Sequence, residues 1–394
     1  MTAKLGDRSL FPELEAAAYL NHAAISPPSR PVIEAVTRTM SRAAELGVPA
    51  FMQAMEERDA LRAALAEMVG APHADDVAFV ANTTRGVTDV ALCLPWVRGD
   101  RVVLTEGEFP ANVTPWQRAA ALFELEIVWL PRPSAEGIDG WLEALDAALS
   151  AGARLVAISA VQFQSGLRMP LSRIGAACKR AGTQLFVDAI QACGAVPIDV
   201  TKERIDYLAC GSHKWLMGPE GLAFLYVARE RAAELAPRVA GWTSHEEAFR
   251  FLFEGRGHLR YDRPFVRNAR MVEGGMPNLI GAAGLAASVG LIATLGVSTI
   301  HDHVQRYLDG LEAELVGRGF SSRRAAEPGL RSGMLCVDPP AGVNVVALFE
   351  AIDGDEVACA IPDGVLRFAP HWPNRLEEIP GVLAAIDEAL ARVG

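Results

Sequence analysis

Apolar runs of strand length alternate with Ala-rich runs of helix length through the first half of the chain. The apolar runs are rich in Val, Ile, Leu and Phe and show little alternation, which is typical of strands covered on both faces. They lie at residues 77–81, 101–106, 125–130, 154–161, 183–189, 206–211 and 222–227. Between them, 141–152 and 172–182 have a polar face and a terminal Gly, which predicts helices. The alternation predicts an α/β fold on a mostly parallel, doubly wound sheet.

The pattern changes from about residue 285. A helix-like run at 301–319 is followed by short strand-like runs near 333–337 and 365–369, and then by a closing helix from Leu376. We therefore predict a large domain at 25–278 and a smaller α+β domain at 279–394, to which an N-terminal arm of residues 1–24 is added. The charged and aromatic stretch 243–270 predicts an irregular excursion before the second domain.

Charge and cysteine usage narrow the class of protein. The 394 residues carry 37 Lys and Arg against 48 Asp and Glu, a net charge of −11, which argues against a general nucleic-acid binder. The six cysteines show no zinc-like spacing and predict buried, reduced thiols of a cytosolic protein.

Residues 279–300 are uncharged and long enough for a membrane span. Their Gly and Ala content predicts instead a buried helix that ends near Gly296, in a soluble protein without a membrane partner.

Polar residues follow the predicted strands, where ligands bind in open α/β sheets. They are Thr83, Thr84, Glu108, Phe109, Gln162, Asp188, Ser212, His213 and Lys214. Lys214 precedes Trp215 and two further apolar residues, and a desolvated lysine can form a Schiff base, although a solvated loop lysine would fit the same composition. Asp188 closes an apolar strand, so it needs either a cationic partner such as a pyridinium nitrogen or a helix to cap.

The segment Asn82–Gly86 lies between a predicted strand and a predicted helix. Its hydroxyls and backbone N–H groups suit a phosphate, but an ordinary helix cap requires the same residue types. The chain contains neither G-x-x-x-x-G-K-[ST] nor G-x-G-x-x-G. The usual signatures of P-loop and dinucleotide-binding enzymes are therefore missing.

Four segments together resemble the class V aminotransferase family of fold type I enzymes, which use pyridoxal 5′-phosphate (PLP). They are YLNHAAISP (19–27), VDAIQACGAVPIDV (187–200), GSHKWLMGPEG (211–221) and LRFAPHWPN (366–374). The family includes cysteine desulfurases, kynureninase, isopenicillin N epimerase and several aminotransferases. The most specific feature is Asp188 followed 26 residues later by Lys214.

The resemblance implies a role for each matching residue, within a large domain that binds PLP and without a metal. Lys214 matches the catalytic Schiff-base lysine, which also moves the proton at the substrate Cα. Asp188 matches the acid beneath the pyridine nitrogen, Gln191 the partner of the phenolic oxygen, and Phe109 the residue stacked on the ring. The remaining matches are Thr83, Thr84, Ser212 and His213 for the phosphate, Gln162 near the cofactor oxygen, Arg367 for the substrate carboxylate, and Asn21 and His22 in the substrate pocket.

Two positions depart from the family. Met276 stands where many members have a Thr that reaches the neighbouring subunit's phosphate, so that contact is in doubt. Desulfurases carry a nucleophilic Cys well upstream of the carboxylate-binding Arg. Here Cys359 lies only eight residues before Arg367 in an apolar run, which predicts a buried structural thiol. Desulfurase activity is therefore disfavoured, and little beyond Phe109 and the Gln162 region resembles kynureninase.

These observations predict an enzyme that acts on an amino acid, with transamination placed first because the family is dominated by it. A lyase that eliminates a β-substituent, including C–S cleavage, and an epimerase remain alternatives. A non-catalytic binding protein that retains the fold is a further one. The resemblance also implies a homodimer. We expect the substrate side chain to be read by the segment around His22 and by the excursion 243–270.

Overall fold

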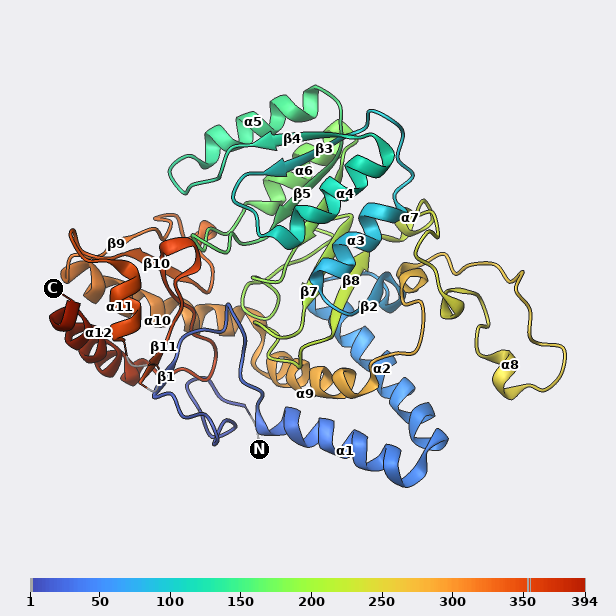
Figure 1. The fold of residues 1–394 in the computed structure, drawn as a ribbon, viewed down its shortest axis with the longest axis horizontal. Coiled ribbons are helices and arrows are strands. Elements are labelled where there is room, and N and C mark those ends of the chain that lie inside the picture. The colour runs from blue at the N-terminus through green and yellow to red at the C-terminus, as the bar shows by residue number, and fades with distance from the viewer. Residues whose placement is uncertain (1–2, 353, 355, 394) are drawn as a thin grey trace.

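The computed structural model of the chain describes residues 3–352, 354 and 356–393. A seven-stranded sheet with the order β2-β8-β7-β6-β5-β3-β4 forms its centre (Figure 1). The strands are β2 (Val77–Val80), β3 (Arg101–Thr105), β4 (Glu126–Leu130), β5 (Ala153–Ser159), β6 (Gln184–Asp188), β7 (Tyr207–Gly211) and β8 (Ala223–Val227). Strand β8 runs antiparallel to both of its neighbours, and the other pairs are parallel. The seven predicted strands and the mostly parallel sheet are confirmed.

Helices cover both faces of this sheet, which explains why its strands lack polar alternation. In β6, Leu185 and Val187 belong to one apolar cluster and Phe186 to the other. Helices α5 (Ile138–Ser150) and α6 (Leu171–Ala181) contribute to the first cluster, and α3 (Thr83–Cys93) and α4 (Thr114–Phe123) to the second. Both predicted helices of this region are therefore present. Gly182 ends α6 in the left-handed conformation, with a φ of 70°.

Long helices connect the sheet to the rest of the chain. Helices α1 (Arg30–Leu46) and α2 (Val48–Met68) both pack against α9 (Leu279–Leu295), which Gly296 ends as predicted. Helix α10 (Val297–Gly317) follows at an angle of 77° to α9. Among the described residues, no single helix has the length and apolarity to cross a membrane, whereas the bent pair α9 and α10 meets both criteria jointly.

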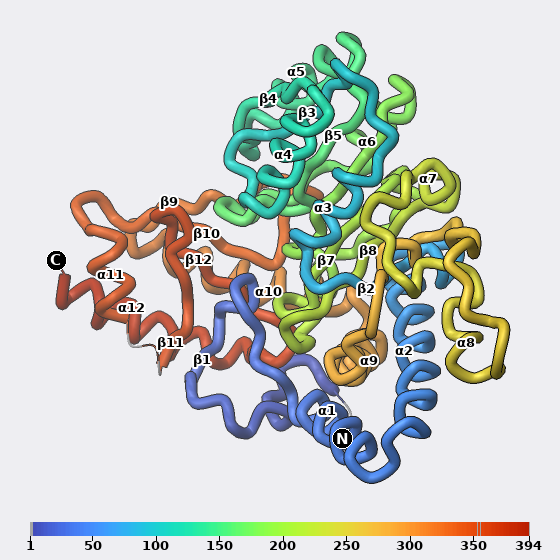
Figure 2. The backbone as a smooth tube through the Cα atoms, turned by 45° about the vertical axis from the view of Figure 1, so that its right-hand side comes forward, coloured from blue at the N-terminus to red at the C-terminus, as the bar shows by residue number. Residues whose placement is uncertain are grey.

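The C-terminal part of the chain forms two small sheets. Strands β12 (Leu366–Phe368), β10 (Leu335–Asp338) and β9 (Ser321–Ser322) are antiparallel, next to helices α11 (Val345–Ala351) and α12 (Ile379–Val393). Strand β1 (Ala18–Tyr19) of the N-terminal arm pairs with β11 (Val357–Ala358), and Asn21 bridges to Ala369 (Figure 2). The arm thus lies against the C-terminal strands. The domain boundaries stay a prediction, and their outer ends at residues 1 and 394 lie outside the described residues.

The stretch 243–270 is irregular, as predicted. Apart from short helical turns such as α8 (Arg250–Phe253), it is a long loop that projects from the body after α7 (Arg229–Ala232) (Figure 1). All six cysteines are free and buried, which confirms their expected burial.

Candidate active site

The carboxyl ends of five strands meet at one edge of the sheet. Strands β3, β5, β6 and β7 are parallel, and β2 has the same direction because it and β7 both run antiparallel to β8. The residues that follow them at this edge are Thr83, Phe109, Gln162, Asp188 and Lys214. The strand-end pattern therefore gathers the predicted residues as expected.

Lys214 stands in the loop after β7 with its amine near an aromatic ring. Its Nζ atom lies 5.5 Å from the centroid of Phe109, a ring that is still 44% exposed. The pKa of Lys214 is lowered to about 8: burial is the main cause, the Asp188 carboxylate opposes it, and the charge of Arg367 adds to the lowering. A lysine with this pKa is partly neutral near neutral pH, so it can act as a nucleophile or as a base.

Asp188 is the last residue of β6 and is almost completely buried. Its Oδ1 atom accepts a hydrogen bond of 3.0 Å from the backbone N–H of Ile190. The pKa of Asp188 is raised to about 7: burial is the main cause and the Glu108 carboxylate adds to it, whereas the Ile190 N–H and the Lys214 ammonium oppose the rise. A cationic group placed against this carboxyl would favour its ionised form.

The N-terminus of α3 forms a cradle next to the lysine loop. The Asn82 side chain caps the helix by accepting a bond of 2.8 Å from the Arg85 N–H. The buried Thr83 hydroxyl has no hydrogen-bond partner within the described residues. A Cβ atom on Gly211 would lie only 3.2 Å from Thr83 Oγ1 and from a ring carbon of His213, so a side chain at this position would crowd the space beside the Thr83 hydroxyl. The cradle suits an anion at a helix N-terminus.

Three further phosphate candidates differ in their surroundings. Thr84 is exposed at the same helix end. The Ser212 hydroxyl is fully buried and lies against the backbone carbonyl oxygens of Leu222, at 2.8 Å, and of Pro219. His213 is half-buried, and burial together with the Lys214 charge lowers its pKa. Contact of Thr84, Ser212 and His213 with a phosphate stays a prediction.

Both predicted glutamines are held by neighbouring groups. Gln191 Nε2 donates to the Ala23 carbonyl at 3.0 Å, and its Oε1 accepts from the Trp215 indole at 2.8 Å. Gln162 Nε2 donates to Glu108 Oε1 at 3.0 Å. Their side chains are therefore oriented before any ligand binds, and each amide nitrogen keeps one further proton to donate.

Glu108 is a site residue to which the resemblance assigned no role. Besides Gln162, its buried carboxylate accepts from the Ser159 N–H at 2.8 Å, from the Ser159 hydroxyl and from Asn112 Nδ2 at 3.4 Å. Burial raises the pKa of Glu108, and these donors lower it. The carboxylate thus ties the ends of β3 and β5 together beside Asp188. In the sequence, the only indication of this role was that Glu108 is one of the polar residues that follow strand β3.

The predicted substrate residues lie on the C-terminal strands and the arm. Buried Arg367 of β12 donates from Nη1 to the Phe163 carbonyl at 3.1 Å. Its Nε atom, like Asn21 Oδ1, is buried without a hydrogen-bond partner in the part of the chain that the structure describes. The His22 ring is buried, with its Nδ1 atom 2.7 Å from the Ser26 hydroxyl. Burial, helped by His371, holds the pKa of His22 well below its usual value.

One protein family matches most of the length of this chain. The family model for class V aminotransferases matches residues 18–338. The chain belongs to the class V aminotransferase family. It is 30% identical to the uncharacterized aminotransferase YcbU of Bacillus subtilis over 98% of this chain and 97% of that protein. It is 29% identical to a probable cysteine desulfurase of Pyrococcus abyssi over 97% of this chain and 96% of that protein.

Solved structures agree with the fold. The cysteine desulfurase CsdA of Escherichia coli superposes with a TM-score of 0.83 at 22% identity, over 98% of both chains. The predicted fold type I architecture is therefore confirmed, and this class V chain is a PLP-dependent enzyme. The residues present fit PLP, because the Thr83 hydroxyl, the Asn21 side-chain oxygen and Arg367 Nε are the kind of unpartnered buried groups that a polar ligand satisfies.

The two positions that depart from the family pattern, Met276 and Cys359, differ in their exposure to solvent. Met276 is 72% exposed on the turn before α9. Cys359 is buried just after β11, and this burial raises its pKa to about 12. At neutral pH its sulfur is therefore a thiol and not a nucleophilic thiolate.

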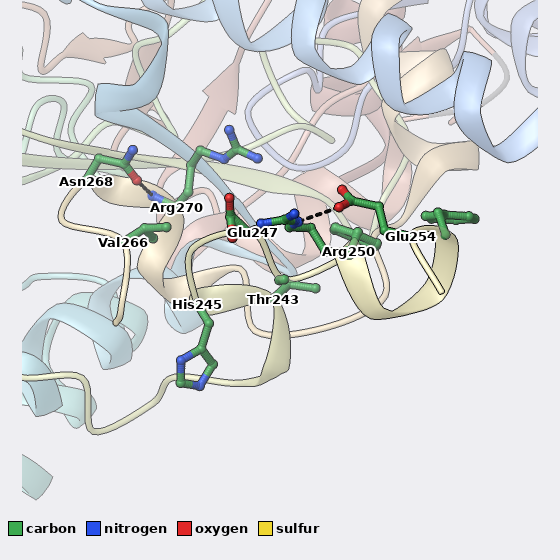
Figure 3. A pocket seen from close by; sticks show the side chains of 11 residues that line it. Thr243, His245, Glu247, Arg250, Glu254, Val266, Asn268 and Arg270 are labelled. Atoms are coloured by element: carbon green, nitrogen blue, oxygen red, sulfur yellow. Dashed lines mark hydrogen bonds and ion pairs between the residues drawn. The ribbon is translucent and has the colours of Figure 1, made fainter. Parts of the chain in front are cut away.

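A separate cavity of about 370 Å³ lies within the projecting loop (Figure 3). Thr243, His245, Glu247, Arg250 and Arg270 are among the residues that line it. Glu247 accepts from Arg250 Nη1 at 2.8 Å and from Arg263 Nη1 at 2.6 Å, so ion pairs brace the loop. Substrate recognition by this loop stays a prediction.

Proposed function

We propose that this chain is an aminotransferase that acts on an amino acid through Lys214. The observation that carries the proposal is the lysine itself, with a pKa lowered to about 8 and an amine facing the Phe109 ring beside Asp188 and Arg367. PLP, when bound, withdraws electrons from the substrate Cα and so acidifies its proton. The residues of this chain supply binding, orientation and proton transfer.

Each side chain has a defined task in this proposal. Lys214 would hold the cofactor covalently and, once free, would carry the Cα proton of the substrate. Asp188 would keep the ring nitrogen protonated, and Phe109 would pack against the ring. Gln191 and Gln162 donate to cofactor oxygens with the amide protons that Ala23 and Glu108 leave free.

The polar ends of the ligands are then held by charge and by hydroxyls. Thr83, Thr84 and His213 bind the phosphate at the α3 cradle. Ser212, which was also predicted to do so, instead donates its N–H and its hydroxyl to backbone carbonyl groups. Arg367 binds the substrate carboxylate through its fork, for which the unpartnered Nε is available. Asn21 and His22 border the substrate on the side of the arm.

A PLP lyase is the alternative, favoured by the likeness to the Pyrococcus abyssi desulfurase. Elimination of a β-substituent requires only a base such as Lys214, whereas a desulfurase also requires a nucleophilic thiolate. The burial and raised pKa of Cys359 oppose that second requirement. Epimerisation, with return of the proton to the other face, would use the same residues.

We also propose a homodimer in a reducing, cytosolic compartment. Exposed apolar side chains on α1, on the turn before α9 and on the projecting loop support an interface; among them are Ile33, Met40, Met276, Phe253 and Tyr261. Six buried free thiols support the compartment. Light scattering that gave only a monomer would contradict the first of these two proposals.

Visible absorption and product analysis test the function. We expect a PLP band that borohydride abolishes and that Lys214→Ala lacks. With L-alanine and no amino acceptor, a transaminase releases one pyruvate per active site and stops, whereas a lyase given L-cysteine releases sulfide over many turnovers. A protein that remains colourless in excess PLP would contradict the whole proposal, and sustained sulfide release would replace transamination by elimination.

A further inference from the structure

The backbone carbonyls of His213, Lys214 and Trp215, in the loop that carries the lysine, accept hydrogen bonds from distant parts of the chain. The loop's own turn supplies two bonds, from the Met217 N–H to the Lys214 carbonyl and from the Gly218 N–H to the Ser212 carbonyl, both 2.9 Å. The remaining donors come from the two ends of the chain. The Ser26 N–H donates to the His213 carbonyl at 2.8 Å, and the Ser26 hydroxyl donates to the Lys214 carbonyl at 2.6 Å.

The third carbonyl is held from the other end of the chain. His371 Nε2 lies 2.8 Å from the Trp215 carbonyl oxygen, and its Nδ1 accepts from the Trp372 N–H at 2.7 Å. Because Nδ1 is an acceptor, the proton must sit on Nε2, which therefore donates. The backbone packs tightly here, since a Cβ atom on Gly194 would lie only 2.3 Å from the Trp215 oxygen.

The direction of the Ser26 bond is also determined by its neighbours. A hydroxyl has one proton to donate, and Ser26 uses it on the Lys214 carbonyl. His22 Nδ1, at 2.7 Å, must then donate to the serine oxygen. The hydrogen bonds from His22 through Ser26 to the Lys214 carbonyl therefore have one defined direction. They need no ligand to form.

The same segments carry the predicted substrate residues. His371 follows Arg367 by four residues. The His22 N–H donates to the Ala369 carbonyl at 3.1 Å, so the arm and the strand of Arg367 are joined to each other as well as to the lysine loop. These bonds hold the backbone of the lysine loop against the segment that carries Arg367. Misplacement of a reacting group by about 1 Å can slow an enzyme roughly 100-fold.

We propose that Ser26 and His371 are positioning residues for Lys214, each holding a backbone carbonyl of its loop so that the amine meets the substrate Cα correctly. The proposal rests on the catalytic role proposed for Lys214. It assigns a function to two side chains whose hydrogen bonds go to the backbone of the lysine loop.

The test uses the PLP-loaded enzyme in D₂O. NMR follows the exchange of the Cα proton of L-alanine for deuterium, whose rate measures proton transfer by Lys214. We expect Ser26→Ala and His371→Leu to lower the maximal exchange rate by roughly 10- to 100-fold, because the amine is misplaced, with a change in KM below about threefold. The visible circular dichroism of the bound PLP should change as well. Ser26→Thr and His371→Gln keep a donor at the same place and should restore both signals.

Ser29→Ala is the matched control. Ser29 is a buried serine of the same segment, and its hydroxyl has no partner among residues 3–352, 354 and 356–393. Exchange within about threefold of the wild-type rate in Ser26→Ala and His371→Leu would overturn the proposal. Equal slowing in Ser29→Ala, or no rescue by Ser26→Thr and His371→Gln, would overturn it too, because general loosening would then be the cause.

Two outcomes separate this proposal from the one on which it rests. Should His371→Leu not fold, Ser26→Ala decides, since it removes a single oxygen. A Lys214→Ala variant that retained both the borohydride-sensitive band and Cα exchange would refute the role of the lysine itself. Loss of both in Lys214→Ala, with wild-type behaviour in Ser26→Ala, would refute only the positioning role.

Discussion

Acid should destabilise this protein through His371, and the size of the effect can be worked from its surroundings. The ring is fully buried, and burial lowers its pKa to about 4, although its bond to the Trp215 carbonyl opposes the shift. A proton on Nδ1 would also face the Trp372 N–H and remove the acceptor of that bond. The folded protein therefore requires the neutral ring.

The sign and magnitude follow from linkage. The pKa of about 4 in the folded protein lies below the value of 6.5 in the unfolded chain. The unfolded chain therefore binds more protons between these pH values, and the free energy of unfolding decreases as the pH is lowered. The contribution is fully present above about pH 6.5 and is lost towards pH 4. The difference between a pKa of 6.5 in the unfolded chain and about 4 in the folded protein corresponds to roughly 3.4 kcal/mol in total, of which about 2 kcal/mol is lost between pH 7 and pH 5.

Urea unfolding at pH 7, 6 and 5, with PLP in constant excess, measures this contribution. We expect the free energy of unfolding of His371→Gln to fall by about 2 kcal/mol less than that of the wild type between pH 7 and pH 5. Identical pH dependences in the wild type and His371→Gln would refute the reasoning, because the ring would then be equally protonated in both states.

Three further changes test other parts of the structure. Glu273→Ala should cost about 3–5 kcal/mol in urea unfolding, because it removes the carboxylate that lies 2.9 Å from buried Arg58 and 2.6 Å from buried Arg62 and leaves only Asp59, 3.3 Å from Arg62, to offset their charges; a loss below about 1 kcal/mol would contradict this. Thr83→Val should raise the PLP dissociation constant roughly 10-fold, measured by absorbance titration, since a bond to a charged group is lost; unchanged affinity would remove Thr83 from the phosphate site. Cys359→Ser should leave Cα exchange and any sulfide release from L-cysteine within about twofold of wild type, and a selective loss of sulfide release would identify a thiol nucleophile.

Local sequence determined the elements and much of the site. Each central strand appears in the sequence as a continuous apolar run, because helices cover both of its faces and bury side chains on each face. The strand-end rule then placed Asp188 and Lys214 at one edge, since parallel strands end on the same side. Comparison with the class V family supports the identity that the Asp188–Lys214 spacing indicated.

The tertiary structure alone decided how those residues are held and charged. Ser26 and Lys214 are 188 positions apart, and His371 and Trp215 are 156 apart, so no local pattern relates them. The pKa values of Lys214 and Asp188 likewise depend on burial and on charges from other strands. A hydrogen-bond partner and a desolvated environment come from whichever segments the fold brings near, which is why residue type and spacing could name the lysine but not the groups that position it.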